Sequence, residues 1–208
     1  MIYLATALGA YLLGSIPWGW IIGRIKGVDL RREGSGSTGA TNALRVLGKP
    51  WGYTVFVLDA LKGGLAVAGA FALARQTPGF EAHAVWLGVV AAISAVVGHS
   101  YPVWLGFQGG KGIATSAGVM IALFHPAVFL SGLGVWLILF KATRYVSVAS
   151  LGAAVALPTS AAIVWALGDG DAPRTGIALA MCVVAVWRHR SNIARLLAGT
   201  EKRFEKKP

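Results

Sequence analysis

The chain has 208 residues, of which 56% are hydrophobic and only 13% are charged, and its mean hydropathy is +0.65. Soluble domains carry about 25% charged residues, so this composition excludes an ordinary soluble domain and indicates a protein embedded in a lipid bilayer. The formal net charge of +11 indicates basic loops near anionic lipid rather than nucleic-acid binding, because the basic residues flank apolar runs instead of forming a separate domain.

Seven apolar runs follow one another along the chain and predict transmembrane helices. A helix needs ~20 residues to cross the hydrocarbon core, and the fourth and fifth runs are shorter than this. The first run lacks the basic start and the cleavage site of a signal peptide, so we expect it to be a helix of the protein. The runs span residues 2–22, 51–74, 84–107, 113–124, 127–140, 148–167 and 176–187.

The fourth and fifth runs leave two alternatives open. Residues 113–140 form either two short helices broken at His125-Pro126 or one kinked helix, which gives seven or six spans. With seven spans, sixteen of the 19 Lys and Arg residues fall on one side, in segments 24–50, 108–112, 141–147 and 188–208. Such a bias marks the cytoplasmic side. We therefore expect an all-α, polytopic membrane protein, a single domain over residues 1–208, with seven transmembrane helices (two short), the N-terminus outside and the C-terminus cytoplasmic.

Two charged residues, Asp59 and Lys62, lie inside the second run, three positions apart. Charges within a span are costly and often functional. The simpler interpretation is a mutually neutralising pair near a helix end, and that interpretation is favoured here.

The segment at residues 34–42 combines three glycines with four hydroxyl side chains and an amide. Glycines allow successive backbone N–H groups to converge on an anion, and the loop leads into a predicted helix at 40–47 whose N-terminus favours negative charge. Arg45, about one turn into that helix, could bind a phosphate through two hydrogen bonds. The alternative is a flexible loop with a Ser or Thr cap. The candidate phosphate-binding residues are Ser35, Gly36, Ser37, Thr41, Asn42 and Arg45.

A second glycine-rich segment, Gly109-Gly110-Lys111-Gly112, opens the fourth run. It again combines backbone amides, a cation and a helix N-terminus, which together favour an anion. It is not a P-loop, because Gly112 stands where that motif requires Ser or Thr after the lysine. The segment therefore predicts a site for a small phosphate group rather than a nucleotide.

Two further candidates lie near the predicted cytoplasmic side. Ser147 and Ser150 lie on one helical face at the start of the sixth run and could line a binding site. The alternative is that one serine caps the helix and the other packs against a neighbouring helix. His189 and Asn192 lie three positions apart on a basic helix after the last run and could face a binding site. The alternative is that this helix only contacts lipid. No His-x-x-x-x-Asp pair and no cluster of metal-ligating side chains occurs, so we expect neither a metal nor a cofactor.

Taken together, these motifs resemble those of the bacterial acyl-phosphate:glycerol-3-phosphate acyltransferases, in order and from the first span to the tail. Two positions depart from the family: Ser37 replaces an asparagine, and Gln108 replaces a lysine, which removes one positive charge. The matching motifs are Gly14-Ser-Ile-Pro17, Asp29-Leu-Arg31, Gly34-Ser-Gly36, Gly39-Ala-Thr-Asn42, Arg45, Gly98-His99, Tyr101-Pro102, Gly106-Phe107, Gly109-Gly-Lys-Gly112, Asn192-Ile-Ala-Arg-Leu196 and Gly199-Thr-Glu201.

The resemblance implies a seven-helix enzyme that transfers a fatty acyl group from acyl phosphate to the 1-hydroxyl of glycerol 3-phosphate. The products would be lysophosphatidic acid and phosphate, in the first acylation of bacterial phospholipid synthesis. It further implies a location in the bacterial inner membrane, a site that faces the cytoplasm, contact with membrane lipid and a link to the enzyme that makes acyl phosphate.

For catalysis we single out Lys111, His189 and Asn192. The base is either His189 or the phosphate of the substrate itself, and the second is favoured, because a histidine beside a membrane more often serves as a hydrogen-bonding residue. The alternative from another class of protein is a transporter of phosphate or organic phosphate. It is disfavoured because the motifs cluster at one membrane face rather than at the midplane.

Overall fold

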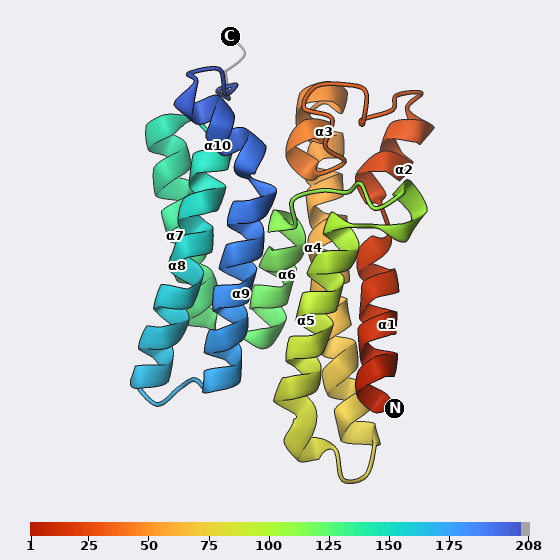
Figure 1. Cartoon of the computed structure of the whole chain (residues 1–208), viewed down its shortest axis with the longest axis vertical. Coiled ribbons are helices and arrows are strands. Elements are labelled where there is room, and N and C mark those ends of the chain that lie inside the picture. The colour runs from red at the N-terminus through yellow and green to blue at the C-terminus, as the bar shows by residue number, and fades with distance from the viewer. Residues whose placement is uncertain (205–208) are drawn as a thin grey trace. The chain divides into compact units, whose positions relative to one another are not determined.

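The computed structural model describes residues 1–204, and that part of the chain is all-helical (Figure 1). The predicted all-α class is therefore confirmed. The chain divides into two compact units, Met1–Leu123 and Phe124–Pro208, and each is described below by itself. The expectation that residues 1–208 act as one domain stays a prediction.

The first unit is built around helix α5 (Ala84–Ser100), which packs against both α1 (Ile2–Ser15) and α4 (Lys49–Gln76). Alanines from these three helices form its core together with Leu87, and small side chains allow membrane helices to pack closely. The unit also contains α2 (Trp18–Ile25), α3 (Ala40–Leu47), α6 (Ile113–Leu123) and the short 3₁₀ turns η1 (Glu81–His83) and η2 (Val103–Leu105).

Helices α4 and α6 approach each other most closely at glycines. A Cβ at Gly118 of α6 would overlap the backbone oxygen of Ala60, and a Cβ at Gly63 of α4 would overlap that of Thr115. Only the absence of a side chain allows this backbone contact. The contact fixes α6, and the loop that precedes it, against α4.

The second unit is a row of three helices in which α8 (Val146–Ala166) packs against both α7 (Pro126–Thr143) and α9 (Ala172–Arg188). A short helix, α10 (Arg190–Leu197), follows α9 directly. The Asp171 carboxylate caps α9 by accepting a 2.8 Å hydrogen bond from the Arg174 backbone N–H. Such a cap satisfies one of the donors that a helix start leaves without a partner.

Each of the seven predicted runs contains a helix, but not every helix is long enough to cross a bilayer. Among the described residues, five segments meet the length and hydropathy of a span, whereas α6 has 11 residues and α9 has 17. Seven spans and the orientation of the termini therefore stay predictions. The five segments are Ile2–Ile25, Lys49–Gln76, Glu81–Leu105, Pro126–Thr143 and Val146–Ala166.

The predicted break at His125-Pro126 is confirmed, because α6 ends at Leu123 and α7 begins at Pro126. His125 caps the new helix through Nδ1, which accepts from the Ala127 N–H at 3.3 Å. A second break was not predicted. It divides the first run into α1 and α2 at Ile16-Pro17, where proline has no N–H to continue the helical hydrogen bonding.

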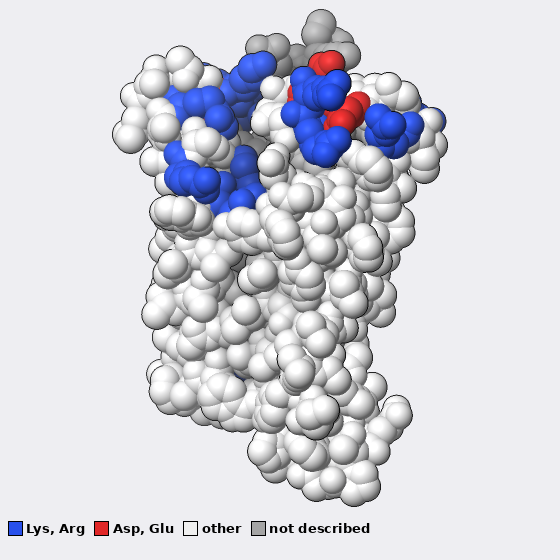
Figure 2. All heavy atoms as spheres, turned by 45° about the vertical axis from the view of Figure 1, so that its right-hand side comes forward, with Lys and Arg blue, Asp and Glu red and all other residues white. Residues whose placement is uncertain are grey.

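Among the described residues, charged side chains lie in loops or near the ends of the helices, apart from Asp59 and Lys62 inside α4. Figure 2 shows Lys and Arg side chains at helix ends, with a few acidic ones beside them, while the helix sides carry no charge in this view. In the first unit, the long loop between α2 and α3 and the loop between α5 and α6 lie at the same end of the helices (Figure 1). These two loops carry the glycine-rich motifs.

Candidate functional site

The loop between α2 and α3 is folded around a single side chain, that of Asn42. This residue lies in the first turn of α3 and is only 1% exposed. Its Nδ2 donates to the backbone oxygens of Leu30, Glu33 and Ser37 at 3.0, 3.0 and 2.8 Å, and its Oδ1 accepts from the Ser35 N–H at 2.8 Å. The amide of Asn42 therefore gives the loop its shape.

The predicted helix at 40–47 is confirmed, and its cap is not the Ser or Thr of the alternative interpretation. Gly39 occupies the N-cap position in an extended conformation, and the Ser37 hydroxyl accepts from the Gly39 N–H at 3.2 Å. Ser35 and Gly36 are exposed on the outer side of the loop, while Ser37, Thr41 and Arg45 are half-buried. Ser35 and Arg45 thus belong to one compact loop-and-helix motif.

An ion pair also stiffens the start of this loop. Asp29 accepts from Nε and Nη2 of Arg31 at 3.0 and 2.7 Å and from the Arg31 backbone N–H at 3.1 Å. The hydrogen bonds from Arg31 hold the pKa of Asp29 well below its usual range. The carboxylate therefore stays charged and bound to Arg31 at neutral pH, which makes it a poor general base.

The Gly109–Gly112 segment lies flat against the end of α5. The Gly109 N–H donates to the backbone oxygen of Ser100 and the Gly110 N–H to that of His99, each at 3.2 Å. These two amides were expected to be bare donors for phosphate, and they instead hold the loop in place. Lys111 follows at the point where the chain turns through Gly112, with φ of +85°, into the start of α6. Gly112 is buried and Lys111 half-buried.

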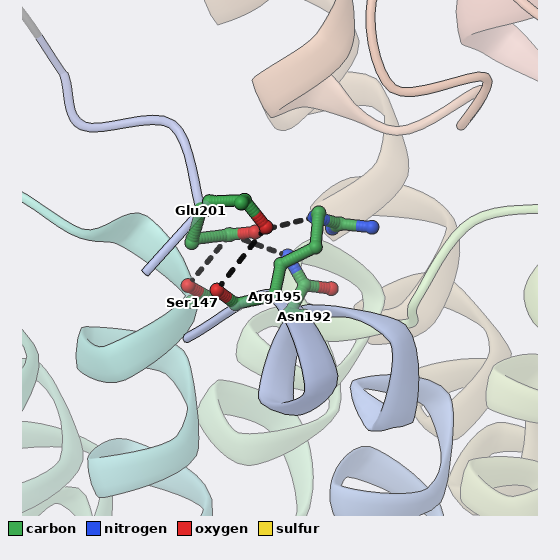
Figure 3. Close-up of polar contacts among 5 residues, drawn as sticks. Ser147, Asn192, Arg195 and Glu201 are labelled. Atoms are coloured by element: carbon green, nitrogen blue, oxygen red, sulfur yellow. Dashed lines mark hydrogen bonds and ion pairs between the residues drawn. The ribbon is translucent and has the colours of Figure 1, made fainter. Parts of the chain in front are cut away.

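In the second unit, the structure brings Ser147 and Asn192 together around a carboxylate that had been given no role, that of Glu201 (Figure 3). Glu201 Oε1 accepts from Ser147 Oγ at 2.8 Å and from Asn192 Nδ2 at 2.6 Å, and Oε2 accepts from Arg195 Nε at 2.7 Å. The only sequence signal for this residue is its place in the motif Gly199-Thr-Glu201. Helices α8 and α10 are thus joined by one side chain from the tail.

Burial and hydrogen bonding act on Glu201 in opposite directions. Burial alone would raise the pKa of the carboxyl, but the hydrogen bonds from Asn192, Arg195 and Ser147 outweigh it and the pKa is lowered. The adjoining tail is anchored as well, because the Phe204 N–H donates to the Arg144 backbone oxygen at 2.8 Å. Glu201 is therefore a charged, fixed part of the unit at neutral pH.

The remaining predicted residues of the second unit face inward. His189, 3% exposed, lies at the junction of α9 and α10, with Nδ1 2.8 Å from the Ala185 backbone oxygen. Nδ1 therefore carries a hydrogen, and Nε2 is the nitrogen that could accept a proton. Ser150 Oγ accepts from Trp136 Nε1 at 3.4 Å, within the contact between α7 and α8. Within residues 1–204, no group of three or more His, Cys, Asp or Glu side chains could hold a metal ion.

Comparison with known proteins identifies the family. The family model described as glycerol-3-phosphate acyltransferase matches residues 4–199. A glycerol-3-phosphate acyltransferase of Synechococcus elongatus is 49% identical over 203 residues, which cover 97% of this chain and 94% of the relative. Another, from Gloeobacter violaceus, is 44% identical over 196 residues, which cover 94% of this chain and 91% of the relative.

Solved structures of similar proteins point to the same family. The glycerol 3-phosphate form of PlsY (YgiH), an integral membrane glycerol 3-phosphate acyltransferase, matches with a TM-score of 0.85 and 40% identity over 98% of this chain and 96% of that chain. The lysophosphatidic acid form of PlsY matches with a TM-score of 0.83 and 39% identity over 98% of this chain and 95% of that chain. The chain belongs to the glycerol-3-phosphate acyltransferase family, and it is an integral membrane acyltransferase.

Proposed function

We propose that this enzyme transfers a fatty acyl group from acyl phosphate to the 1-hydroxyl of glycerol 3-phosphate, at the cytoplasmic face of the bacterial inner membrane. The products are lysophosphatidic acid and inorganic phosphate. Family membership favours this enzyme over a phosphate transporter. The PlsY structures, named for their glycerol 3-phosphate and lysophosphatidic acid forms, support this acceptor and this product.

The observation that carries the proposal is the position of two cationic loops at one end of the first unit. The 34–42 segment and helix α3 after it offer Ser35 and Arg45, and the 109–112 segment offers Lys111 beside the start of α6. Both substrates are phosphate esters or anhydrides, and guanidinium, ammonium and hydroxyl groups are their usual ligands. We assign substrate phosphate to these two loops.

The reaction is a direct acyl transfer. The acceptor hydroxyl attacks the acyl carbonyl, a tetrahedral oxyanion forms, and the bond from the carbonyl carbon to the phosphate oxygen then breaks, so phosphate leaves with the electron pair. The hydroxyl proton passes to a phosphate oxygen of the substrate or to Nε2 of His189. Asn192 is the proposed donor to the oxyanion, where one donor contributes ~10²–10³ in rate.

The proposal is tested with the purified full-length protein in detergent. Acyl phosphate and glycerol 3-phosphate should together release phosphate and form lysophosphatidic acid, whereas acyl-CoA in place of acyl phosphate should give no product. Lysophosphatidic acid formed from acyl-CoA at an equal rate would overturn the proposed donor.

A lysine variant tests the site. Lys111→Ala should lower kcat/KM by about 100-fold, because a charge that contacts phosphate contributes several kcal/mol in a water-poor site. Lys141→Ala is the matched control, since this lysine is exposed in the last turn of α7. Equal kcat/KM values for both variants and the natural enzyme would remove Lys111 from the site.

Seven transmembrane helices and an outside N-terminus complete the proposal. The short α6 and α9 support this count as spans that cross part of the hydrocarbon core or cross it with flanking residues, as membrane helices buried in protein can.

A further inference from the structure

The first unit contains a buried polar chain that the proposed reaction does not use. Asp59 and Lys62 of α4 and His99 of α5 are 1%, 3% and 6% exposed. Lys62 Nζ lies 2.8 Å from Asp59 Oδ1, and His99 Nδ1 lies 3.5 Å from the same oxygen. Lys62 Nζ also donates to the Ile16 backbone oxygen at 2.8 Å. The chain therefore joins α4, α5 and the break between α1 and α2.

Charge balance accounts for only part of this arrangement. Asp59 and Lys62 neutralise each other, so the pair satisfies the simple interpretation of two charges in a span without any further group. His99 is a third member of this buried chain, and it is not needed to neutralise Asp59 or Lys62. Its ring must be explained by what it contacts on the side away from Asp59.

That side of the ring faces the 109–112 loop. A Cβ at Gly110 would overlap Nε2 of His99 and lie 2.8 Å from its Cε1, so the ring rests directly against the Gly110 backbone. The backbone oxygen of His99 also accepts from the Gly110 N–H. A single residue thus contacts Asp59 through one ring nitrogen and supports the loop through the other edge of the ring.

The loop is fixed at two points, and the buried chain ties those points together. Its beginning is bonded to the end of α5 at His99 and Ser100, and the helix that follows it packs against α4 at Gly63, beside Lys62. Lys111 lies between these anchors. Because His99 and Asp59 link α5 to α4, they set the separation of the anchors and hence the position of Lys111.

We propose that His99, oriented by Asp59, is a positioning residue that fixes the 109–112 loop for the binding of a substrate phosphate. Asp59 Oδ1 lies on the Nδ1 side of the His99 ring, and the edge that carries Nε2 rests against Gly110 of the loop. The proposal rests on the proposed function only for the role of Lys111. The fixing of the loop by His99 stands apart from it.

The first measurement does not depend on activity. Hydrogen exchange of the full-length protein is followed by mass spectrometry for peptides that cover 101–112 and, as an internal reference, 166–174. His99→Ala should speed exchange of the 101–112 peptide by at least about tenfold, because without the supporting ring the amides of Gly109 and Gly110 separate more often from their backbone acceptors. The reference peptide should exchange at the natural rate. Unchanged exchange at 101–112 would overturn the proposal.

The second measurement is the split between KM and kcat. His99→Ala should raise KM by about tenfold for at least one phosphate substrate while kcat changes less than about threefold, since a displaced loop weakens binding. His99→Gln places an amide where Nε2 lies and should recover most of the loss. Leu87→Ala, in the core of α5, controls for lost stability and should leave KM unchanged.

The outcomes separate the two proposals. Equal increases of KM in the Leu87 and His99 variants would reduce His99 to a packing residue and overturn the inference. Faster exchange at 101–112 with unchanged KM for both substrates would leave His99 as the residue that fixes the loop, and would instead overturn the assignment of Lys111 to substrate phosphate.

Discussion

Asn42 has a structural role in its loop that the sequence alone does not reveal. Sequence alone selects it because an amide in a glycine-rich loop is a plausible phosphate ligand. In the structure, its side chain is buried and bonded to four backbone groups of its own loop. Periodicity cannot reveal such a contact, since the fold of an irregular loop depends on which buried backbone groups still need a partner. The predicted substrate contact of Asn42 stays a prediction.

A second single residue, Glu201, leads to a prediction about how the stability of the protein depends on pH. Its folded-state pKa is lowered from 4.5, so its contribution to stability is complete above that value and is lost as pH falls through the folded pKa. At pH 7, Glu201→Gln should lower the free energy of unfolding by about 2 kcal/mol, the usual loss for hydrogen bonds to a charged group. This corresponds to about 4–8 °C in Tm for a chain of this size.

The difference in Tm between Glu201→Gln and the natural protein should shrink as the pH falls below 4.5, where the natural carboxylate is increasingly protonated. Glu81→Gln, at an exposed acid in η1, is the control and should match the natural protein throughout. A gap that stays constant from pH 7 to pH 3 would show that the charge of Glu201 contributes nothing.

Among the elements, helix existence was easier to predict than helix continuity. Long apolar runs identify helices because a bilayer allows the backbone few other ways to satisfy its hydrogen bonds. The break at Pro126 was predicted from charge placement, whereas the break at Pro17 was missed. Pro17 lies inside an uninterrupted apolar run, and the carbonyl that the break exposes, at Ile16, is satisfied by Lys62 from another helix. No local pattern contains that information.

Helix packing offers a test with an internal control. Gly118→Ala should destabilise the protein by about 1–3 kcal/mol, because its new Cβ overlaps the backbone oxygen of Ala60 and overpacking has this cost. Gly69→Ala lies in the same helix pair, on an exposed position of α4 with nothing within 4 Å. It should instead stabilise by about 0.5–1 kcal/mol, the propensity gain of alanine over glycine.

Unfolding in detergent, monitored by thermal or chemical denaturation, measures both variants. The two changes are chemically identical, so a difference of sign isolates the contact between α4 and α6. Equal stabilities would contradict the close approach of these helices.

At the scale of the whole molecule, the uneven distribution of Lys and Arg between the two sides predicts how the chain is oriented in the membrane. In a background without Cys182, an impermeant maleimide added to intact cells should label Ala82→Cys in the predicted outer loop. It should label Ala142→Cys, at the end of α7, only after the membrane is permeabilised. Both positions are exposed, and only two of the 19 Lys and Arg residues lie in the predicted outer loops, in keeping with the positive-inside rule. Labelling of Ala142→Cys in intact cells would reverse the orientation.

The fold class and the family could be predicted from the sequence because apolar runs and ordered motifs are local features. The site could be predicted only in part. The glycine-rich loops were located, but the amides of Gly109 and Gly110 are used within the fold. Glu201 was missed as the common acceptor of Ser147 and Asn192, since contacts across 54 and 9 positions depend on tertiary structure.

The position of Glu201 in the chain has a consequence for biosynthesis. Ser147 and Asn192 are bonded to a carboxylate that the ribosome adds after α10 is complete. A nascent chain can therefore place every helix in the bilayer while these two residues still lack their acceptor. Insertion of the helices therefore does not complete the second unit, because Ser147 and Asn192 gain their acceptor only when the tail docks.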